Sequence, residues 1–442
     1  MTIHRRSFLR NISMISLGTG ITAAIPIDIL AAIRKKISPA EKINVGVIGC
    51  RGQGWSNLTS MLRLPEIQCT ALCDVDETVL NNRKKDLEKI NNHPTLFKDY
   101  RKLLESKDVD VVIIATPDHW HCLQMVDSCA AGRAIYMEKP VSNSIIEAQI
   151  MLAAAHKHNS FVQVNQWQRS QQHFKKAIEI VHSGQLGKIH STRAWMYRGG
   201  TTALPVLPNE EVPAGVDYAM WLGPAENRPF NKNRFHYEFR WFWDYAGGLM
   251  TDWGVHLIDM VLLGMKAGDP KSVVSSGGKF IFPGDARLTP DLQTAVYDYG
   301  DFQMTWEHHM GMGSGPWGLQ HGISFSGENG TLLLNRGGWE IRPDKQQGKD
   351  KMEAVAWQKA TDNGMDMHTT NFVESLKANK KELLNCPIEA GVKVAIHAHM
   401  GNVAHRSNEK IFWNEAENKF NIKAANKLLA PEYHNGWKLP KV

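Results

Sequence analysis

The stretch INVGVIGCRGQGWSNLTSMLRL, residues 43–64, decides the fold of the N-terminal part of the chain. Its first seven residues, 43–49, are mostly apolar and β-branched and end in glycine, which is typical of a strand buried in a parallel sheet. After a glycine-rich loop, apolar side chains recur at helical spacing, at Leu58, Met61, Leu62 and Leu64. The stretch therefore predicts a strand, a glycine loop and a helix, in that order.

The loop between this strand and this helix is a candidate phosphate cradle. A pyrophosphate approaches the backbone closely at a helix N-terminus, where free N–H groups and the helix dipole favour negative charge. Gly49 and Gly54 fit the first and third positions of the G-x-G-x-x-G spacing, but Arg51 occupies the second. We predict that Gly49, Cys50, Arg51, Gly52 and Gly54 contact a dinucleotide, although a glycine loop alone is a weak signal.

The next strand, predicted within IQCTALCDVD at residues 67–76, ends in an acid that points to the identity of the nucleotide. Asp74 lies about twenty residues beyond the loop, where a carboxylate accepts hydrogen bonds from ribose hydroxyls. A carboxylate at this position repels a 2′-phosphate. The sequence therefore predicts NAD rather than NADP, and the alternative is a surface acid at a strand end.

The alternation of strands and helices continues over the following residues. Residues 109–115 form another apolar strand, which Thr116 and Pro117 end at the edge where ligands bind in open α/β sheets. A helical segment and the short strand 134–137 follow, and then Glu138, Lys139 and Pro140. Repeated strand–helix alternation predicts a doubly wound parallel sheet, and hence an α/β fold.

Length and charge limit the classes of protein that this chain resembles. A chain of 442 residues exceeds what one hydrophobic core usually serves, so we expect two domains. The formal net charge of +6 is spread along the chain, and no basic run is interleaved with aromatic residues. Nucleic acid is therefore not an expected partner. The six cysteines show no C-x-x-C pair, and we expect them to be buried free thiols.

The first 32 residues resemble a twin-arginine export signal. Arg5 and Arg6 precede a modest apolar segment, and small residues follow at positions 30–32, where a peptidase could cut. The alternative is a membrane anchor, but Pro26 and Asp28 interrupt a run that is shorter than the ~20 apolar residues of a membrane span. We therefore expect export to the periplasm without stable membrane insertion. Removal of residues 1–32, whose net charge is +2, lowers the formal charge from +6 to +4.

A second candidate site lies in GGLMTDWGVHLIDM, residues 247–260. On a helix, positions i and i+4 share one face, so Asp252 and His256 are expected to project into the same space. Imidazole suits proton transfer because its ordinary pKa lies near 6.5. The alternative is a histidine that packs in the core or caps a helix.

The segments VGVIGC, ALCDVD, IATPDHWH, AGRAIYMEKP and GGLMTDWGVHLID together resemble the Gfo/Idh/MocA family of oxidoreductases, from about residue 43 to the C-terminus. The resemblance implies an N-terminal NAD(P)-binding Rossmann domain, which we place at residues 41–165. It also implies a C-terminal α/β domain with a large open, mostly antiparallel sheet, which we place at residues 166–442. Strand-like stretches at 190–199, 271–282, 292–310 and 321–335 supply matching material for that sheet. Such sheets form oligomer interfaces in many relatives, so a homo-oligomer is possible.

The family motifs also suggest roles for individual residues. The resemblance implies that Lys139 lies beside the nicotinamide and the substrate hydroxyl, with His256 as the base and Asp252 orienting the substrate or tuning the imidazole. His121 matches a histidine that the family commonly shows after the Thr-Pro turn. Together with Asp118 and His119 it looks like a metal site, but no third strong ligand is evident and no metal is expected.

Aromatic residues crowd the approach to this second site, and they suggest a carbohydrate pocket. Sugar rings present apolar faces that stack on aromatic rings while their hydroxyls bind polar groups. Core packing is the alternative for each of these aromatic residues. The candidate substrate-binding residues are Tyr197, Arg198, Trp241, Trp243 and Tyr245.

These observations lead to one main functional hypothesis and two alternatives. The first is an exported NAD(H)-dependent oxidoreductase acting on a secondary hydroxyl or carbonyl of a sugar, polyol or glycoside. Because no obvious free nicotinamide pool exists outside the cytoplasm, its cofactor would be tightly bound and recycled. The second is an NAD-dependent glycoside hydrolase or lyase that works by transient ring oxidation and elimination. The third is a non-catalytic carbohydrate-binding protein on the same fold, for which Arg51 in the glycine loop is the best support.

Overall fold

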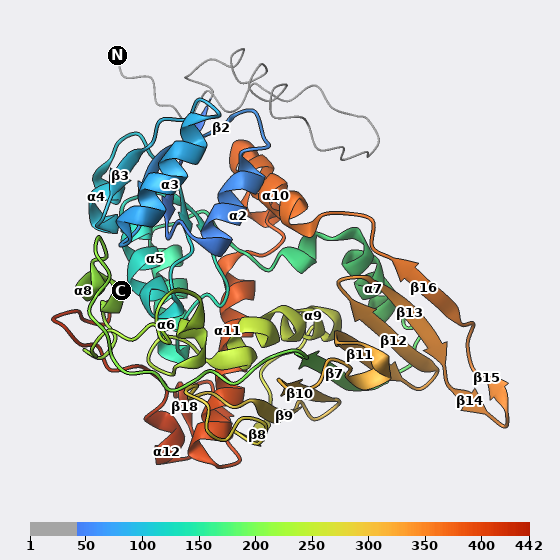
Figure 1. Cartoon of the computed structure of the whole chain (residues 1–442). Coiled ribbons are helices and arrows are strands. Elements are labelled where there is room, and N and C mark those ends of the chain that lie inside the picture. Colours follow the sequence, from blue (N-terminus) through green and yellow to red (C-terminus); the bar gives the residue numbers. More distant parts are fainter. Residues whose placement is uncertain (1–41) are drawn as a thin grey trace.

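The computed structural model describes residues 42–442, and Figure 1 shows two sheets joined by long helices. The first sheet has six parallel strands in the order β3-β2-β1-β4-β5-β6. The predicted doubly wound parallel sheet is therefore confirmed. Its strands are β1 (Ile43–Ile48), β2 (Ile67–Cys73), β3 (Thr95–Phe97), β4 (Val111–Ile114), β5 (Ala134–Met137) and β6 (Val162–Val164).

Helices cover both faces of this sheet because successive strand residues point to opposite sides. Val47 and Ile113 pack in one hydrophobic core, whereas their neighbours Ile48 and Ile114 pack in the other. All four side chains are buried, which explains why the strands are apolar at consecutive positions. The helices of this region are α2 (Gly52–Met61), α3 (Glu77–Glu88), α4 (Tyr100–Glu105), α5 (His121–Ala130) and α6 (Ile145–Lys157).

The second sheet has eight strands in the order β16-β13-β12-β11-β7-β10-β9-β8. All its neighbouring pairs are antiparallel except β7 with β10, so the expected large, mostly antiparallel sheet is present. A small hairpin of β14 (Lys345–Gln346) and β15 (Lys349–Asp350) projects from its end (Figure 1). The strands are β7 (Ile189–Tyr197), β8 (Ser272–Gly278), β9 (Leu292–Asp298), β10 (Gln303–His309), β11 (His321–Gly327), β12 (Gly330–Asn335), β13 (Gly338–Pro343) and β16 (Val355–Lys359).

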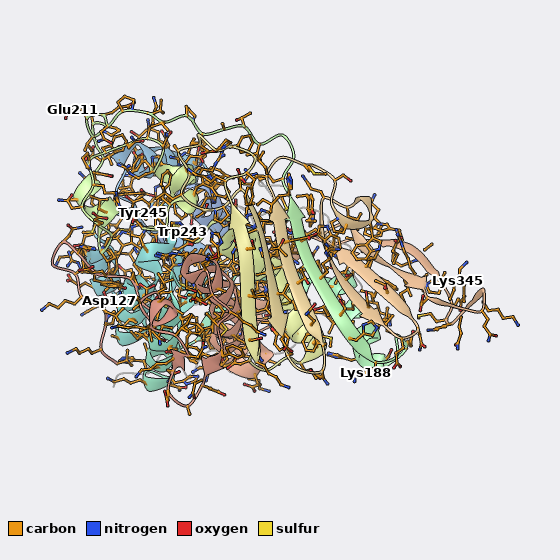
Figure 2. The ribbon with its side chains drawn as sticks, turned by 90° about the horizontal axis from the view of Figure 1, so that it is seen from below. Asp127, Lys188, Glu211, Trp243, Tyr245 and Lys345 are labelled. Atoms are coloured by element: carbon orange, nitrogen blue, oxygen red, sulfur yellow. The ribbon has the colours of Figure 1, made fainter. Side chains whose placement is uncertain are left out.

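One face of the large sheet is covered by helices. Helices α7 (Gln172–Ser183), α9 (Val255–Met265) and α11 (Ile388–Ser407) pack against its strands. The opposite face is turned toward the viewer in Figure 2, with the strands in front of the helices. An ion pair between Arg193 and Glu307, with 2.8 Å between nitrogen and oxygen, joins β7 to β10 there.

The C-terminal part of the chain also returns to the first sheet. Helix α10 (Gly364–Ala378) lies beside α2, where Ser60 Oγ donates a hydrogen bond to Asp366 Oδ1 over 2.7 Å (Figure 1). On the same helix, Phe372 contacts the ring of Tyr136, with 5.4 Å between the ring centroids. Residues beyond 166 therefore contribute to the hydrophobic core of the first sheet as well as to that of the second.

Three further observations bear on the sequence analysis. All six cysteines, at positions 50, 69, 73, 122, 129 and 386, are buried free thiols. Within residues 42–442, none of the helices combines the length and the apolarity needed to cross a membrane. The predicted export signal at residues 1–32 lies outside the described residues.

Candidate active site

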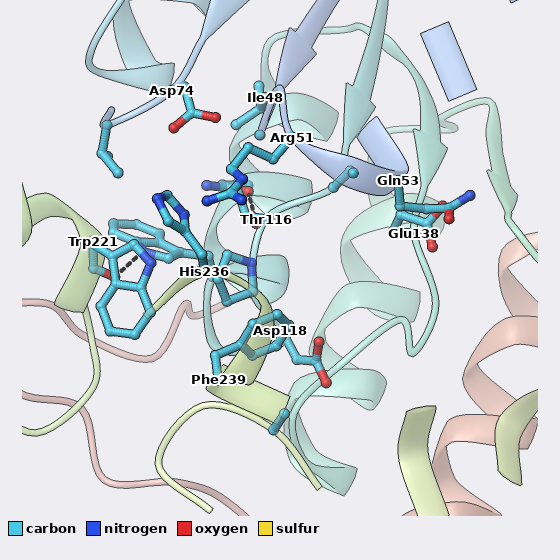
Figure 3. A pocket seen from close by; sticks show the side chains of 18 of the residues that line it. Ile48, Arg51, Gln53, Asp74, Thr116, Asp118, Glu138, Trp221, His236 and Phe239 are labelled. Atoms are coloured by element: carbon cyan, nitrogen blue, oxygen red, sulfur yellow. Dashed lines mark hydrogen bonds between the residues drawn. The ribbon is translucent and has the colours of Figure 1, made fainter. Parts of the chain in front are cut away.

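A pocket of about 360 Å³ lies at the carboxyl ends of β1, β2, β4 and β5, as expected for an open α/β sheet. Figure 3 shows that Asp74, Thr116 and Glu138 line it from the Rossmann side. His236 and Phe239, from the C-terminal part of the chain, line the facing wall. The pocket is therefore a cleft between the two parts of the molecule.

The glycine loop has the geometry of a phosphate cradle. A Cβ atom on Gly54 would lie 1.9 Å from the carbonyl oxygen of Gly49, so only glycine lets the helix approach the strand this closely. Gly49 itself has φ +87°, and a Cβ there would meet the Ala115 carbonyl oxygen at 2.6 Å. Helix α2 begins at Gly52 without a side-chain cap, so its first N–H groups are free for an anion. These features fit a bound dinucleotide pyrophosphate.

The other two loop residues differ in their surroundings. Arg51 is exposed and lines the pocket, whereas Cys50 is buried and does not. The Cys50 thiol instead donates to the carbonyl of Cys73 over 3.4 Å. The contribution of Cys50 to the site is therefore its backbone N–H, which donates to Asp74 Oδ2 over 2.8 Å.

Asp74 is held by the backbone and faces the pocket. Its second oxygen accepts a hydrogen bond from the backbone N–H of Asp76 over 3.1 Å. Each carboxylate oxygen has two lone pairs, so both oxygens keep an acceptor position for a ribose hydroxyl. Burial raises the pKa of Asp74 to about 6, against the hydrogen bonds from Cys50 and Asp76, which lower it.

The turn after β4 contributes both pocket residues and supporting residues. Thr116, Pro117 and Asp118 line the pocket, but His121 does not. The two ring nitrogens of His121 lie 2.8 Å from the Pro140 carbonyl oxygen and 2.9 Å from that of Thr116. His121 therefore holds two pocket loops together. Within residues 42–442, no group of three histidine, cysteine or carboxylate side chains is arranged to hold a metal ion.

Glu138 supports the pocket from within the Rossmann domain. Its carboxylate accepts hydrogen bonds from Asn57 Nδ2 over 2.7 Å and from Asn165 Nδ2 over 2.5 Å. The backbone N–H of Lys139 donates to its other oxygen over 3.1 Å. These contacts connect α2, β5 and the segment after β6, and they fix the backbone from which Lys139 extends.

Lys139 and Asp252 meet across the cleft and both line the pocket. Lys139 Nζ donates to Asp252 Oδ1 and to the Asp252 carbonyl oxygen, over 2.8 Å in both cases. Arg240 Nε lies 3.5 Å from Asp252 Oδ2. The two cations outweigh the effect of burial and hold the pKa of Asp252 well below its usual range. Asp252 is therefore ionised and keeps the ammonium of Lys139 in place.

The segment that carries Asp252 and His256 differs from the predicted regular helix. Met250–Gly254 is a π-helical turn, and α9 begins only at Val255. Such turns widen a helix locally and occur frequently at functional sites. Because a π-helical turn is wider than an α-helical turn, the side chains at positions i and i+4 need not share one face, so the structure itself decides where they point. Asp252 faces the pocket, whereas His256 lies outside the pocket lining.

His256 is 6% exposed, and its Nδ1 atom is buried without a hydrogen-bond partner. Its ring contacts those of Trp167 and Trp253, with 6.2 Å and 6.3 Å between the centroids. Burial lowers the pKa of His256 well below its usual value, and the charges of Lys139 and Arg336 lower it further. His256 is therefore a neutral imidazole within electrostatic reach of Lys139.

The predicted substrate-binding residues are dispersed in the structure. Trp241 and Tyr245 are 2% and 0% exposed, so they pack in the hydrophobic core rather than on a pocket surface. Trp243 lines a separate pocket of about 270 Å³. Figure 2 labels Trp243 and Tyr245, which come from the segment before the π-helical turn. The 3-10 helix His236–Trp241 ends here and turns follow, so no regular period sets the directions of these three side chains.

The remaining two predicted substrate residues lie at the end of β7. Tyr197 donates to Glu307 Oε1 over 3.2 Å and does not line the pocket. Arg198 donates to the hydroxyl of Tyr237 over 3.1 Å, and Tyr237 does line it. Arg198 is therefore connected to the pocket through a second residue.

Several residues at the site were not assigned to cofactor or substrate binding from the sequence. Asp118 and Arg240 line the pocket, and burial raises the pKa of Asp118 well above its usual value. Arg336 and His321 lie near His256, whose pKa both of them lower. These two residues come from turns and strands of the large sheet, some 65 and 80 residues beyond His256. Only the path of the folded chain brings them to the cleft.

The fold and the pocket define a two-part protein whose N-terminal Rossmann domain has a site shaped for a dinucleotide. Comparison with protein families agrees with this. Residues 43–166 match the family model for the NAD-binding Rossmann fold of the oxidoreductase family, and residues 171–276 match the model for its C-terminal alpha/beta domain. The chain belongs to the Gfo/Idh/MocA oxidoreductase family, and its cofactor is NAD.

The curated relatives are distant. An uncharacterized oxidoreductase, YrbE of Bacillus subtilis, is 27% identical over 256 residues, which span 58% of this chain and 63% of the relative. A glycosyl hydrolase family 109 protein of Shewanella putrefaciens is 29% identical over 161 residues, which span 33% of this chain and 35% of the relative. Each match covers less than two thirds of the relative.

Solved structures share the fold at low sequence identity. The WlbA dehydrogenase from Bordetella pertussis, in complex with NADH and UDP-GlcNAcA, has a TM-score of 0.63 at 15% identity, over 84% of this chain and 99% of that one. A levoglucosan dehydrogenase, in complex with NADH and levoglucosan, has a TM-score of 0.62 at 16% identity, over 84% and 99%. These likenesses show the two-domain fold.

Proposed function

We propose that the protein is an NAD-dependent oxidoreductase that acts on a secondary hydroxyl or carbonyl group of a sugar, polyol or glycoside. The observation that carries the proposal is the ion pair of Lys139 with Asp252, which joins the two walls of the cofactor pocket over 2.8 Å. The sugar-acting names of the solved structures with this fold support the substrate class.

The residues of the cleft have separate tasks in this reaction. The glycine loop at residues 49–54 and Asp74 hold NAD, which when bound supplies the acceptor or donor of hydride. The ammonium of Lys139 stabilises negative charge on the substrate oxygen and orients that oxygen. Asp252, which is ionised, keeps Lys139 aimed into the cleft.

His256 is the proposed proton acceptor. Oxidation of an alcohol releases the hydroxyl proton, and a base must hold it. Because burial and the charges of Lys139 and Arg336 keep the imidazole neutral, one of its ring nitrogens has a free lone pair for the proton that the hydroxyl releases. Its lack of a hydrogen-bond partner at Nδ1 leaves that nitrogen available once substrate is bound.

We further propose that the cofactor is held tightly and is recycled within the catalytic cycle. Residues of the C-terminal part contact the segment that follows Asp74, the proposed ribose-binding acid. His236 Nε2 lies 3.0 Å from Asp76 Oδ2, the Glu77 N–H donates to the Gly215 carbonyl over 3.0 Å, and the Asp217 N–H donates to the Val75 carbonyl over 2.9 Å. These contacts must open before the cofactor leaves, which slows its release.

A second candidate function is redox-neutral glycoside hydrolysis or elimination. The similarity to glycosyl hydrolase family 109 proteins favours it, although that match covers only a third of each chain. In this reaction the hydride removed early from the sugar ring is returned at the end, so no net oxidation results. The non-catalytic carbohydrate-binding alternative is less favoured, because the ion pair of Lys139 with Asp252 in the cofactor pocket supports a role in a reaction.

Three measurements test these proposals. Mass spectrometry of freshly purified, denatured protein is expected to detect stoichiometric NAD or NADH; its absence, with no binding of added NAD, contradicts the proposal. Incubation with neutral sugars and with aryl glycosides then separates the two reactions, because oxidation yields a carbonyl product and hydrolysis releases the aglycone. The variant His256→Ala is expected to lower the rate of the chemical step by roughly 10²–10⁴-fold without loss of bound NAD.

Export and self-association complete the proposal. The sequence of residues 1–32 supports twin-arginine export to the periplasm, and fractionation of cells that express the full chain tests it. The open face of the large sheet (Figure 2) supports a homo-oligomer. Light scattering coupled to size-exclusion chromatography tests the oligomer, and a monomer at micromolar concentration contradicts it.

A further inference from the structure

A cluster of basic and aromatic side chains includes the proposed proton acceptor, His256. The reaction described above uses only that histidine and the effect of Arg336 on its pKa, and it assigns no ligand to the other side chains. We call it the Arg336 cluster, and it consists of Trp167, Trp253, His256, His321 and Arg336. Its members come from four separate places: the turn after β6, the π-helical turn with the start of α9, the first residue of β11, and the turn between β12 and β13. Antiparallel pairing of Ile323 with Leu334 brings His321 and Arg336 to the same edge of the large sheet.

The guanidinium of Arg336 is held on three sides. The rings of Trp167 and Trp253 flank it, each with its centroid 4.4 Å from the guanidinium carbon. Arg336 Nε donates to Gln168 Oε1 over 3.3 Å. The two Nη groups have no hydrogen-bond partner within residues 42–442. The other contacts therefore hold the guanidinium in place and leave its two terminal nitrogens free to donate.

The charge of Arg336 has no carboxylate counterion of its own within the described residues. The acid that acts on it electrostatically is Asp252, and that carboxylate already binds Lys139 and lies near Arg240. Burial lowers the pKa of Arg336 to about 10, so the guanidinium remains charged at neutral pH. A partly buried cation without a counterion costs free energy, which an anionic ligand would recover.

The histidine beside Arg336 is also without a partner. Both ring nitrogens of His321 are buried and have no hydrogen-bond partner, and its ring lies 5.1 Å from that of Trp253, between centroids. Burial lowers the pKa of His321 to about 4, with a smaller contribution from Arg336. A neutral imidazole carries one N–H group, and in His321 that group has no hydrogen-bond partner within the described residues.

We propose that the Arg336 cluster binds a carboxylate group of the substrate, so that the preferred substrate is an acidic sugar such as a uronate or its glycoside. This proposal rests on the proposed function, since the same substrate presents its hydroxyl to Lys139 and His256. The two indole rings cover the sides of the guanidinium and leave the Nη groups at its edge. A planar carboxylate fits such an edge with two parallel hydrogen bonds, whereas a neutral sugar offers no group that balances the charge.

Matched pairs of ligands test the proposal on the NAD-loaded protein. Quenching of tryptophan fluorescence, which Trp167 and Trp253 make sensitive to this site, measures the dissociation constants of glucuronate, galacturonate, glucose and galactose. We expect at least one uronate to bind tenfold or more tightly than its neutral parent. Absence of any such preference, or failure of both uronates to bind, overturns the proposal.

Variants separate recognition from folding. Arg336→Gln is expected to weaken uronate binding by tenfold or more and binding of the neutral sugars by less than threefold. Arg336→Lys keeps the charge but not the paired donors, so its uronate affinity is expected to lie between those of the unmodified protein and Arg336→Gln. Arg342→Gln serves as the control, since Arg342 lies on the same strand pair but is exposed and paired with Glu340. Equal weakening of both ligand classes by Arg336→Gln overturns the proposal.

Activity measurements distinguish this inference from the proposed function. If uronates bind selectively but neither a carbonyl product nor an aglycone appears, the catalytic proposal fails and the carboxylate site stands. If neutral sugars are oxidised and uronates are neither bound nor oxidised, the carboxylate site fails and the catalytic proposal stands.

Discussion

The Rossmann wall of the pocket and the wall supplied by the C-terminal part of the chain are built in different ways. On the Rossmann wall, Gly49, Asp74, Thr116 and Lys139 each lie within two residues of the end of a strand of one parallel sheet. The sheet therefore brings them to one edge. On the opposite wall, a π-helical turn, a 3-10 turn and loops between strands contribute the residues. The first wall therefore follows from a local sequence pattern that repeats along the chain, whereas the second depends on tertiary packing.

This difference also separates two tasks. The Rossmann wall has the features of a general cofactor site, namely a glycine cradle, a free helix N-terminus and a ribose-binding acid. The C-terminal wall carries Asp252 and Arg240, and the groups proposed to select and activate a substrate lie on or behind this wall. Lys139 extends from the Rossmann wall and contacts Asp252 on the other wall. Changes to each wall are therefore expected to affect different steps.

The largest loss of catalytic activity is expected when the charge of Lys139, which joins the two walls, is removed. Lys139→Met keeps the length of the side chain but leaves Asp252 without its main partner and the substrate oxygen without stabilisation. We expect kcat to fall by roughly 10³-fold or more, because loss of one such electrostatic contact costs about this factor. Steady-state kinetics, with the NAD content measured by mass spectrometry, check the result.

Lys98→Met is the matched control, since Lys98 also lines the pocket but is exposed and pairs with Glu77 on the Rossmann side. It is expected to change kcat less than threefold. Loss of bound NAD in Lys139→Met, in proportion to the loss of activity, would show that Lys139 serves the cofactor wall rather than the reaction.

A change confined to the Rossmann wall is expected to act on cofactor affinity instead. In Gly54→Ala the added Cβ would lie 1.9 Å from the Gly49 carbonyl oxygen, so the helix must move away from the loop. We expect NAD to bind roughly 10²-fold more weakly, in line with the effect of displacing a binding group by about 1 Å. Isothermal titration calorimetry on the cofactor-free protein measures this.

Gly268→Ala provides the control for this variant, because no atom lies within 4 Å of the position of its Cβ. It should bind NAD as the unmodified protein does. Unchanged NAD affinity in Gly54→Ala would mean that the loop shifts without cost, and the cradle assigned here would be wrong.

The pH dependence of NAD binding is expected to report on Asp74. Its pKa is about 6 in the folded protein without ligand, and ribose hydroxyls donate to the ionised form. NAD affinity is therefore expected to fall as the pH drops through 6, by up to about tenfold per pH unit. Asp74→Asn should bind NAD more weakly at pH 8 and without this slope, as calorimetry at pH 5, 6, 7 and 8 would measure.

The same carboxyl has a predicted effect on stability, with a defined sign. Because burial raises its folded-state pKa from 3.8 to about 6, the native state binds a proton in this pH range that the unfolded state does not. Its contribution to stability is therefore lost as the pH rises from about 4 to 6. Asp74→Asn should raise the melting temperature of the cofactor-free protein at pH 8 more than at pH 4, and the opposite order contradicts the assignment.

The smallest change in activity is expected when Trp243, an aromatic residue that the sequence assigns to substrate binding, is substituted. Trp243 lines the separate pocket rather than the cleft, and Arg406 lies over its ring at 4.9 Å. Trp243→Ala is expected to change kcat/KM less than twofold. Trp253→Ala, in the Arg336 cluster, is expected to lower it roughly tenfold or more, since stacking and cation–π contacts of this kind contribute about 1–2 kcal/mol when desolvated. Similar effects of the two variants would contradict the division between the two pockets.

The sequence by itself determined the Rossmann wall. Strand, glycine loop, helix and terminal acid lie within about 30 residues, and hydrogen bonds within a parallel sheet bring the ends of its strands to one edge. For this reason the predictions for Gly49, Gly54, Asp74 and the parallel sheet could be made from local pattern. The spacing of Asp252 and His256 also pointed to the right segment, because four positions remain nearby in any helical turn.

Only the tertiary structure decided which aromatic and charged residues face the substrate. An irregular segment carries Trp241, Trp243 and Tyr245, and no period fixes the direction of its side chains. The three residues lie in the core or in another pocket. Trp167, His321 and Arg336 were not predicted, because pairing of distant strands and the packing of α9 bring them together. Local periodicity sets the direction of side chains within one element, but the register and packing between elements set which side chains meet.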